Sequence, residues 1–372
     1  MISSSVAGIV FANSYDEAFG KLTQKRSIAS IPFGGRYRLI DFCLSNLVNA
    51  GVSDVGVITK EKYRSLMDHI GSGVHWDLDR KNGGIMILPP FNRGASRVYQ
   101  GFIEALYSSM DFMIRCNTKY MIVCDARTVA NVDIAAVVRQ HKETNADVTV
   151  VCNRGLKVTN KEQAMKLDIN KDGKITGMHL SYDDNADDIR SMNIYVFDRE
   201  KLIESVKTSY ENGGITVASD LVSANLDKLN VMAYEHKGYA AIMDCITAYR
   251  RANFELLDSD IRADLFNTDR PIYTKTRDDM PTRYGTHSLV KNSLIAEGCI
   301  IEGTVKNSVL FRGVKVEKGA TVENCILMQD VCVNENVVLQ NVISDKNAEI
   351  SNDMIIKGTD EKAFLIEKDQ KI

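Results

Sequence analysis

Residues 12–49 read ANSYDEAFGKLTQKRSIASIPFGGRYRLIDFCLSNLVN, and the rest of the chain is organised around this segment. The apolar run just before it, residues 6–12, predicts a buried first β-strand. The loop after the first strand of an α/β sheet usually holds phosphate groups on bare backbone N–H groups and positive charge. Here the loop has neither a glycine nor a cation and reads Asn13, Ser14, Tyr15, Asp16 and Glu17. Its two carboxylates would repel a triphosphate, so the sequence predicts a degenerate phosphate loop.

The next part of the same segment is cationic and carries glycines. Lys25 and Arg26 are followed by the run FGGRYR at residues 33–38, which contains Arg36 and Arg38. Guanidinium groups suit phosphate because they donate two hydrogen bonds in a fork. The structural alternative is a solvated basic turn, or ion pairs of Arg36 and Arg38 with Asp41. The residues alone favour this structural alternative.

Residues 1–245 alternate short apolar runs with amphipathic stretches. Alternation of this kind predicts an α/β domain with a doubly wound, mostly parallel sheet. The expected strands are residues 55–59, 120–124, 147–152 and 193–197, and the expected helices are residues 38–50, 100–116 and 134–144. Residues 168–175 predict a strand, an Asp-Gly turn and a second strand. Residues 80–97 predict a surface loop, and residues 248–265 a linker helix.

The C-terminal part of the chain repeats a short unit that starts with asparagine. Asn292, Asn307, Asn324 and Asn341 are spaced by 15, 17 and 17 residues, and valine, isoleucine and glycine alternate between them. A repeat of about 18 residues with three short sides is typical of a parallel β-helix. An ordinary β-sandwich is the alternative, but it would need hairpin turns that the sequence does not show.

Composition narrows the classes of function. A net charge of −3 gives no electrostatic case for nucleic acid or an anionic membrane. The eight cysteines are scattered without a C-x-x-C pair, so reduced thiols and no structural zinc are expected. Cys43 and Cys124 lie in apolar runs and are expected in the core. The sequence shows no signal-peptide pattern and no apolar run of transmembrane length, so a cytoplasmic protein is expected.

The run PFGGRYRLIDFCLSNLVNAG at residues 32–51 closely resembles the glucose-1-phosphate adenylyltransferases, also called ADP-glucose pyrophosphorylases. The resemblance continues through GVIT at residues 56–59, SMNIYVFD at residues 191–198 and the C-terminal repeats, and it is strongest to the D-type (GlgD-like) subunit of the glycogen pathway. It implies a nucleotidyltransferase-like domain of GT-A or Rossmann-like type at residues 1–245. A linker helix and connection would follow at residues 246–285, and a left-handed parallel β-helix at residues 286–372.

The resemblance also indicates which substrate positions have changed. The family's glycine- and arginine-rich triphosphate loop falls on residues 13–19, where none of its glycines or arginines remains. Its lysine-proline step falls on Ile28 and Ala29, its loop threonine on Phe102, and its sugar-phosphate lysine near residues 180–182, where Ser181 stands. These changes predict weak or absent catalysis.

Two carboxylates match the family's metal-binding aspartates. Asp125 follows a predicted strand, and Asp244 falls in the family's Asp-Val-Gly-Thr motif, which reads DCIT here. Such a pair could hold the Mg²⁺ that the family uses. A strand-end aspartate is equally common as a turn or cap residue. With the other substrate contacts missing, the sequence favours no catalytic residue and no metal site here.

Lys25, Arg26 and Arg38 match family positions that contribute to a site for anionic effectors. The resemblance therefore implies a phosphorylated small molecule or a nucleotide as effector. It also implies a tetramer with a catalytic homologue, with a homo-oligomer of this chain alone as a further state. Three functions compete: a regulatory subunit with little or no activity, an active glucose-1-phosphate adenylyltransferase, and a sugar-phosphate nucleotidyltransferase of another specificity. Loss of the triphosphate loop favours the first.

Overall fold

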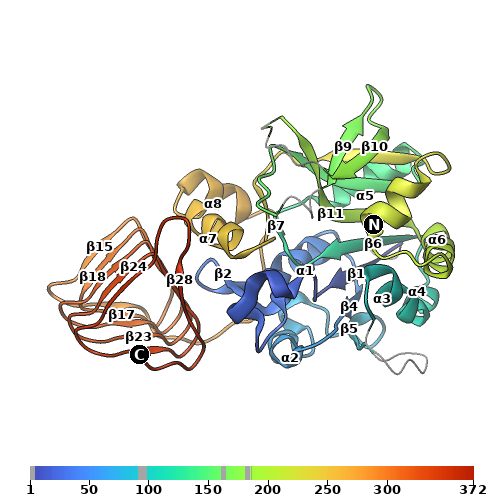
Figure 1. Ribbon diagram of the computed structural model, residues 1–372. Helices are drawn as coiled ribbons and strands as arrows, with labels where there is room; N and C mark the ends of the chain where they lie inside the picture. The colour runs from blue at the N-terminus through green and yellow to red at the C-terminus, as the bar shows by residue number, and fades with distance from the viewer. Residues whose placement is uncertain (1–4, 91–98, 161–164, 181–184, 186) are drawn as a thin grey trace.

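A computed structural model describes residues 5–90, 99–160, 165–180, 185 and 187–372 of the chain. An α/β domain and a β-helix lie beside each other, joined by helices α7 (Ile246–Glu255) and α8 (Ser259–Leu265) (Figure 1). The predicted linker helix is thus two helices. The break lies at residues 256–258, where Asp258 accepts hydrogen bonds from the backbone N–H groups of Asp260 and Ile261 and so begins α8. Among the described residues, no helix is both long and apolar enough to cross a membrane.

The α/β domain is built on a nine-stranded sheet, and the doubly wound fold that the sequence predicts is confirmed. Its main path runs β10-β9-β11-β6-β1-β4-β5, with β8 pairing to β11 and β12 pairing to β8. All strands run in the same direction except β10 and β11. The strands are β1 (Val6–Phe11), β4 (Asp54–Ile58), β5 (Gly84–Leu88), β6 (Tyr120–Asp125), β8 (Val148–Arg154), β9 (Met165–Ile169), β10 (Ile175–Leu180), β11 (Ile189–Asp198) and β12 (Val231–Glu235).

Helices cover both faces of this sheet, and each face has its own hydrophobic core. One core includes side chains of α1 (Leu39–Asn49), α2 (Arg64–Ile70) and α5 (Ile134–Glu143). The other includes side chains of α3 (Phe102–Ser108), α4 (Met110–Arg115) and α6 (Arg199–Glu211). Cys43 and Cys124 lie buried in the first core, as predicted.

Two local predictions were wrong. The single helix expected at residues 100–116 is divided into α3 and α4 at Ser109. Serine favours a break because its hydroxyl competes for nearby backbone groups. Strand β5 lies inside residues 80–97, which the sequence predicts as a loop. Its apolar run is short and is flanked by glycine and proline, which are typical of loops. The rest of that predicted loop, residues 91–98, lies outside the described residues.

The C-terminal part is a left-handed β-helix with three parallel five-stranded sheets, as the asparagine repeat predicts. The first sheet holds β14 (Arg283–Tyr284), β17 (Ile300–Ile301), β20 (Lys315–Val316), β23 (Cys332–Val333) and β26 (Glu349–Ile350). The second holds β15 (Leu289–Lys291), β18 (Thr304–Lys306), β21 (Thr321–Glu323), β24 (Val338–Gln340) and β27 (Ile355–Lys357). The third holds β16 (Leu294–Ile295), β19 (Val309–Leu310), β22 (Ile326–Leu327), β25 (Val342–Ser344) and β28 (Phe364–Ile366).

The repeated asparagines turn the corners between sheets. Asn292, Asn307, Asn324 and Asn341 all have φ between 45° and 55°. Asparagine tolerates this left-handed region better than other residues with a β-carbon. The side chains also stack, since the Asn292 amide donates to Asn307 Oδ1 at 2.8 Å. The spacing read from the sequence is therefore the spacing of the coils.

The segment at residues 12–49 forms the junction between the two domains. Its side chains share a hydrophobic core with α7, α8 and the facing sheet of the β-helix. Phe19, Ile28 and Phe33 are fully buried there, beside Tyr249 and Met328. Short strands β2 (Pro32–Phe33) and β3 (Tyr37–Arg38) pair within the segment, and β7 (Thr128–Ala130) pairs with β13 (Ala240–Ile242) nearby.

Candidate functional site

The loop after β1 is folded back on itself by its own polar side chains. Asn13 Nδ2 donates to Asp16 Oδ2 at 2.7 Å, and Asn13 Oδ1 accepts the backbone N–H of Lys60 at 2.9 Å. Asp16 Oδ1 accepts the backbone N–H of Ile28 at 3.3 Å, and burial raises the pKa of this carboxyl. Ser14 is buried. The loop therefore uses a carboxylate to hold its shape at the place where phosphate would bind.

Tyr15 closes this loop over a buried cation. It adopts φ 56°, and its ring lies 4.4 Å from the guanidinium carbon of Arg127. A cation over an aromatic face is stabilised by the ring quadrupole. The same ring lies 5.9 Å from that of Phe102, which in turn packs edge-on against Phe11 at 4.8 Å. Aromatic groups thus fill the region in which the family resemblance places the nucleotide.

Asp125 at the end of β6 is engaged on both oxygens by Arg127. Arg127 Nε donates to Oδ2 at 2.9 Å, and the Arg127 backbone N–H donates to Oδ1 at 3.0 Å. Both side chains are almost fully buried. A buried carboxylate must be paired, and the arginine supplies the positive charge that a metal ion would otherwise bring.

Asp244, the second metal candidate, holds a neighbouring loop. Its Oδ2 accepts the backbone N–H groups of Thr159 at 2.6 Å and Asn160 at 2.8 Å. Its Oδ1 is buried without a hydrogen-bond partner among the described residues. No group of three or more histidine, cysteine or acidic side chains in the described part of the chain could hold a metal. Because Asp125 is occupied and Asp244 caps a loop, the residues present do not fit Mg²⁺.

A cavity of about 190 Å³ remains above Asp125. Aromatic and aliphatic side chains form most of its wall, and its polar groups come mainly from β11 and residues 216–219. Leu180 also lines it. Ser181, which stands near the family's sugar-phosphate lysine, lies outside the described residues. Arg127 is the one cation among the described lining residues of this cavity, and it is already paired with Asp125.

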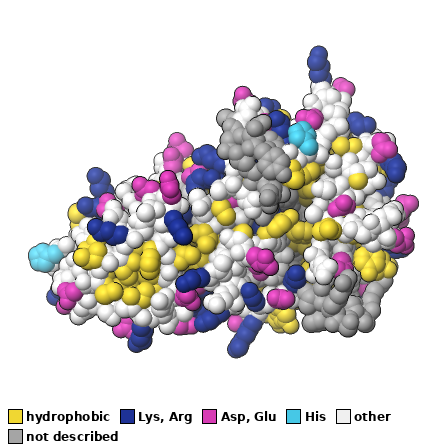
Figure 2. Space-filling model, viewed as in Figure 1, with side chains coloured by type: hydrophobic (Ala, Val, Ile, Leu, Met, Phe, Trp, Pro, Cys, Tyr) yellow, Lys and Arg dark blue, Asp and Glu magenta, His cyan; other side chains and the backbone are white. Residues whose placement is uncertain are grey.

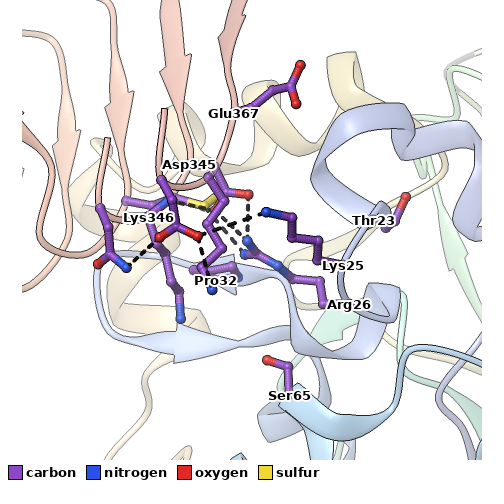
Figure 3. Close-up of polar contacts among 12 residues, drawn as sticks. Thr23, Lys25, Arg26, Pro32, Ser65, Asp345, Lys346 and Glu367 are labelled. Carbon is purple, nitrogen blue, oxygen red and sulfur yellow. Dashed lines mark hydrogen bonds and ion pairs between the residues drawn. The ribbon is translucent and has the colours of Figure 1, made fainter. Parts of the chain in front are cut away.

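The three predicted effector cations have different environments. Arg26 is buried and joins both oxygens of Asp345 in the β-helix at 2.5 Å, with Met328 Sδ at 3.9 Å (Figure 3). Lys25 is exposed and lies 4.0 Å from Asp369. Arg38 donates to the backbone oxygen of Ser65 at 2.6 Å, and burial lowers its pKa to about 10.

Of the three, Arg38 alone lines a second cavity, which lies at the junction of the domains and measures about 270 Å³. We call it the junction pocket. Its cations come from four separate parts of the chain: Arg36 and Arg38, Lys275 and Arg277, Arg312, and Lys346. Asp68 is the one carboxylate among its described lining residues, and burial lowers the pKa of the lining His69, which keeps that ring neutral at pH 7. The excess of positive charge makes this pocket a candidate anion site.

Several of these cations are held by carboxylates at the rim. Arg312 lies between Glu297 (3.4 Å) and Asp279 (3.6 Å), and Arg36 lies 3.5 Å from Glu297. Lys346 follows Asp345 in sequence and has no ion pair among the described residues. Burial lowers the pKa of its ammonium group to about 7, with Arg38 and Arg26 adding to the effect. A ligand with negative charge would relieve this repulsion.

The sequence alone did not identify the charged residues that shape the cavity at Asp125 and the junction pocket. Arg127 carried a local signal, since it lies two residues after the metal candidate Asp125. Four cations of the junction pocket carried no local signal, because they are scattered among ordinary surface charges in the sequence and meet only in the folded chain. They are Lys275, Arg277, Arg312 and Lys346.

Comparisons with known proteins match both parts of the chain. The nucleotidyl transferase family model matches residues 19–240, and the GlmU-like C-terminal hexapeptide model matches residues 278–368. The chain is 36% identical to the glycogen biosynthesis protein GlgD of Bacillus subtilis, over 99% of this chain and 97% of that protein. It is 38% identical to GlgD of Geobacillus stearothermophilus over 86% and 84% of the two chains. It is 34% identical to a glucose-1-phosphate adenylyltransferase of Clostridium botulinum over 87% and 84%.

Proposed function

This chain belongs to the glucose-1-phosphate adenylyltransferase family, and we propose that it acts in glycogen biosynthesis as a regulatory subunit with little or no catalysis of its own. The observation that carries the proposal is the Arg127–Asp125 pair under Tyr15. It places a fixed side-chain cation on the carboxylate that matches a family metal ligand. The names of the GlgD relatives supply the pathway, and the reaction to be regulated is the synthesis of ADP-glucose from ATP and glucose 1-phosphate.

The proposal is tested with three preparations: the purified chain, a catalytic relative, and their mixture. ADP-glucose synthesis is measured in each at matched concentrations of the catalytic relative. We expect the mixture to differ from the catalytic relative alone in maximal rate or in effector response. If the mixture behaves as the sum of its parts at micromolar concentrations, the regulatory role is rejected. A high rate from this chain alone would instead support the competing reading of an active transferase.

We also propose that the junction pocket is where an anionic effector acts. Of the three cations predicted from the sequence, Arg38 lines this pocket. The guanidinium of Arg26 is paired with Asp345, so Lys346 and Arg312 are proposed as effector contacts in its place. An anion there would touch the α/β domain and the β-helix at once, because the lining comes from both. A ligand shifts an equilibrium only through its different affinity for the two states, and a contact across a domain junction provides such a difference.

Substitution of Arg38 by alanine is expected to change the effector response of the mixed complex. A coupling of about 1–3 kcal/mol corresponds to a change of roughly 5- to 150-fold in the effector midpoint. The measurement is an effector titration of ADP-glucose synthesis with phosphorylated metabolites and nucleotides. Lys25→Ala is the matched control, because Lys25 is exposed and lies outside the pocket lining. Unchanged midpoint and maximal activation in an assembled Arg38→Ala complex would exclude the pocket as the effector site.

We propose that the chain assembles with a catalytic homologue into a tetramer and forms a homo-oligomer when alone. The β-helix supports this, since one outward row of its second sheet is uncharged: Leu289, Thr304, Thr321, Val338 and Ile355. Leu289 and Ile355 are exposed, and apolar side chains gather over the β-helix in Figure 2. Exposed rows of this kind are common at protein interfaces.

Ile355→Asp is expected to weaken assembly, because it places a charge on an exposed apolar position of the uncharged row. Light scattering at micromolar concentration should show a lower mean mass for this variant than for the unmodified chain. Met280→Asp is the control, since Met280 is highly exposed but lies off the row. A monomer under all conditions, alone and with the catalytic relative, would contradict the assembly proposal.

A further inference from the structure

Lys346 combines three properties, of which the proposed effector role uses only its place in the junction pocket. Its side chain lines the junction pocket, its amine makes no ion pair among the described residues, and the residue is only partly buried. The Asp345 carboxylate beside it pairs with Arg26 and accepts the backbone N–H of Lys346 at 2.7 Å, but it forms no ion pair with the Lys346 amine (Figure 3). A lysine in this setting is available as a nucleophile.

Burial and the neighbouring cations favour the neutral form of the Lys346 amine. Burial is the main cause of its pKa of about 7, and Arg38, Arg26 and Lys368 lower the value further while Asp345 raises it. The pocket also contains Lys275, Arg277 and Arg312 on the cationic side, with Asp68 opposed to them. Lysine with a perturbed pKa is reactive because a large part of it carries a free electron pair at neutral pH.

The same cations would bind a phosphate group beside this amine. Arg38, Arg277 and Arg312 supply guanidinium groups, which bind phosphate oxygens through two parallel hydrogen bonds. A molecule that carries both a phosphate and an electrophilic carbonyl would therefore be held with its carbonyl near the amine. Proximity of this kind converts a slow encounter into an intramolecular reaction.

We propose that Lys346 is a modification site for acyl phosphates, which transfer their acyl group to its amine in the junction pocket. The amine nitrogen forms a bond to the carbonyl carbon, and the bond from that carbon to the phosphate oxygen breaks. Inorganic phosphate leaves with the electron pair and takes up the proton that the amine loses. The product is a neutral amide, so an acylated Lys346 can no longer carry a positive charge in the pocket.

The inference rests on the same pocket as the proposed effector role, but it concerns a covalent reaction of the chain alone. Acylation would lower the affinity of the pocket for anions, because one cation is lost there. The two ideas fail separately. A mixed complex can respond to effectors through Arg38 without any reaction at Lys346, and Lys346 can be acylated in a chain that never meets a catalytic partner.

The test uses acetyl phosphate, the full chain, and mass spectrometry of peptides to measure acetylation at each lysine over time. At pH 7 about half of Lys346 is neutral, against well under a thousandth of an ordinary lysine, while its lower basicity reduces its nucleophilicity. We expect Lys346 to react about ten- to hundredfold faster than the exposed Lys357 on β27. The rate should saturate with acetyl phosphate and fall when inorganic phosphate is added.

The pH profile separates Lys346 from the exposed lysines. Its rate should rise about tenfold between pH 6 and 8 and then level off, whereas Lys357 should continue to rise about tenfold per pH unit. Arg277→Gln should raise the half-saturating concentration at Lys346 about two- to fivefold, since one partly exposed cation is lost. Lys357→Gln, which removes a cation outside the pocket, should leave it unchanged.

Two results would overturn the inference. Acetylation of Lys346 at the rate of Lys357 would show that the amine is not activated. Fast acetylation that phosphate does not suppress would show that no phosphate site directs the reaction. Acetic anhydride provides the comparison within the same chain, because it acylates amines without a phosphate group and should show no competition by phosphate at any lysine.

Discussion

The isolated chain is expected to make ADP-glucose at least about 10⁴-fold more slowly than a catalytic relative measured in the same assay. Removing one preorganised contact to a transition state costs about 2.7–4 kcal/mol, and several are absent here, even allowing for non-additivity. Asp16 accepts a backbone hydrogen bond that folds the loop after β1 back on itself. Tyr15 and Phe102 pack in the region where the family resemblance places the nucleotide. Arg127 forms an ion pair with Asp125.

The measurement is diphosphate release from ATP and glucose 1-phosphate with Mg²⁺ present in excess. A catalytic relative serves as the positive control. Arg127→Ala should not restore synthesis, because the loop and the aromatic groups still exclude the triphosphate. Turnover by the isolated chain within tenfold of the catalytic relative would overturn the assignment as a regulatory subunit.

Removal of Arg26 is expected to destabilise the chain by about 3–5 kcal/mol, because it leaves a buried carboxylate without its partner. Arg26 and Asp345 are both almost fully buried, and the pair joins the α/β domain to the β-helix across 319 positions of sequence. Arg26→Met is the sharpest substitution, since methionine keeps much of the side-chain volume beside Met328.

Urea unfolding followed by circular dichroism gives the change in free energy of unfolding. Lys21→Met is the matched control, because Lys21 and Glu367 form an ion pair at the same junction but are exposed, and such pairs contribute little. The double variant Arg26→Met with Asp345→Leu should recover most of the loss, since replacing both partners removes the unpaired charge. A single Arg26→Met variant as stable as the unmodified chain would show that the pair does not hold the domains together.

The family resemblance found in the sequence is confirmed by relatives that span nearly the whole chain. The regulatory role, the effector and the partner stay proposals, because those relatives supply a family and a pathway name. The residues assigned to the effector site from the sequence also stay a prediction. In the structure Arg26 is paired with Asp345, and Arg38 lines the junction pocket together with Lys346. The proposed effector site therefore includes Arg38 and Lys346.

The sequence by itself determined the features that depend on near neighbours. Apolar runs predicted β4, β6, β8 and β11, since a buried strand needs apolar side chains along its own length. The asparagines at 15- and 17-residue spacing predicted the coils of the β-helix, because each coil needs a residue that tolerates positive φ at its corner. The missing glycines of residues 13–19 predict a degenerate phosphate loop, and its inability to bind phosphate stays a prediction.

Only the tertiary structure decided which charges neutralise each other. Arg127 could have faced solvent, yet the fold buries it beside Asp125, and the two charges form an ion pair. Arg26 could have bound a ligand, yet the β-helix brings Asp345 to it. Lys346 gains its low pKa from burial and from Arg38, which lies 308 positions earlier in the numbering (346 − 38 = 308). Pairing of buried charges depends on the distance between them and on their removal from water in the folded chain, and the local sequence determines neither.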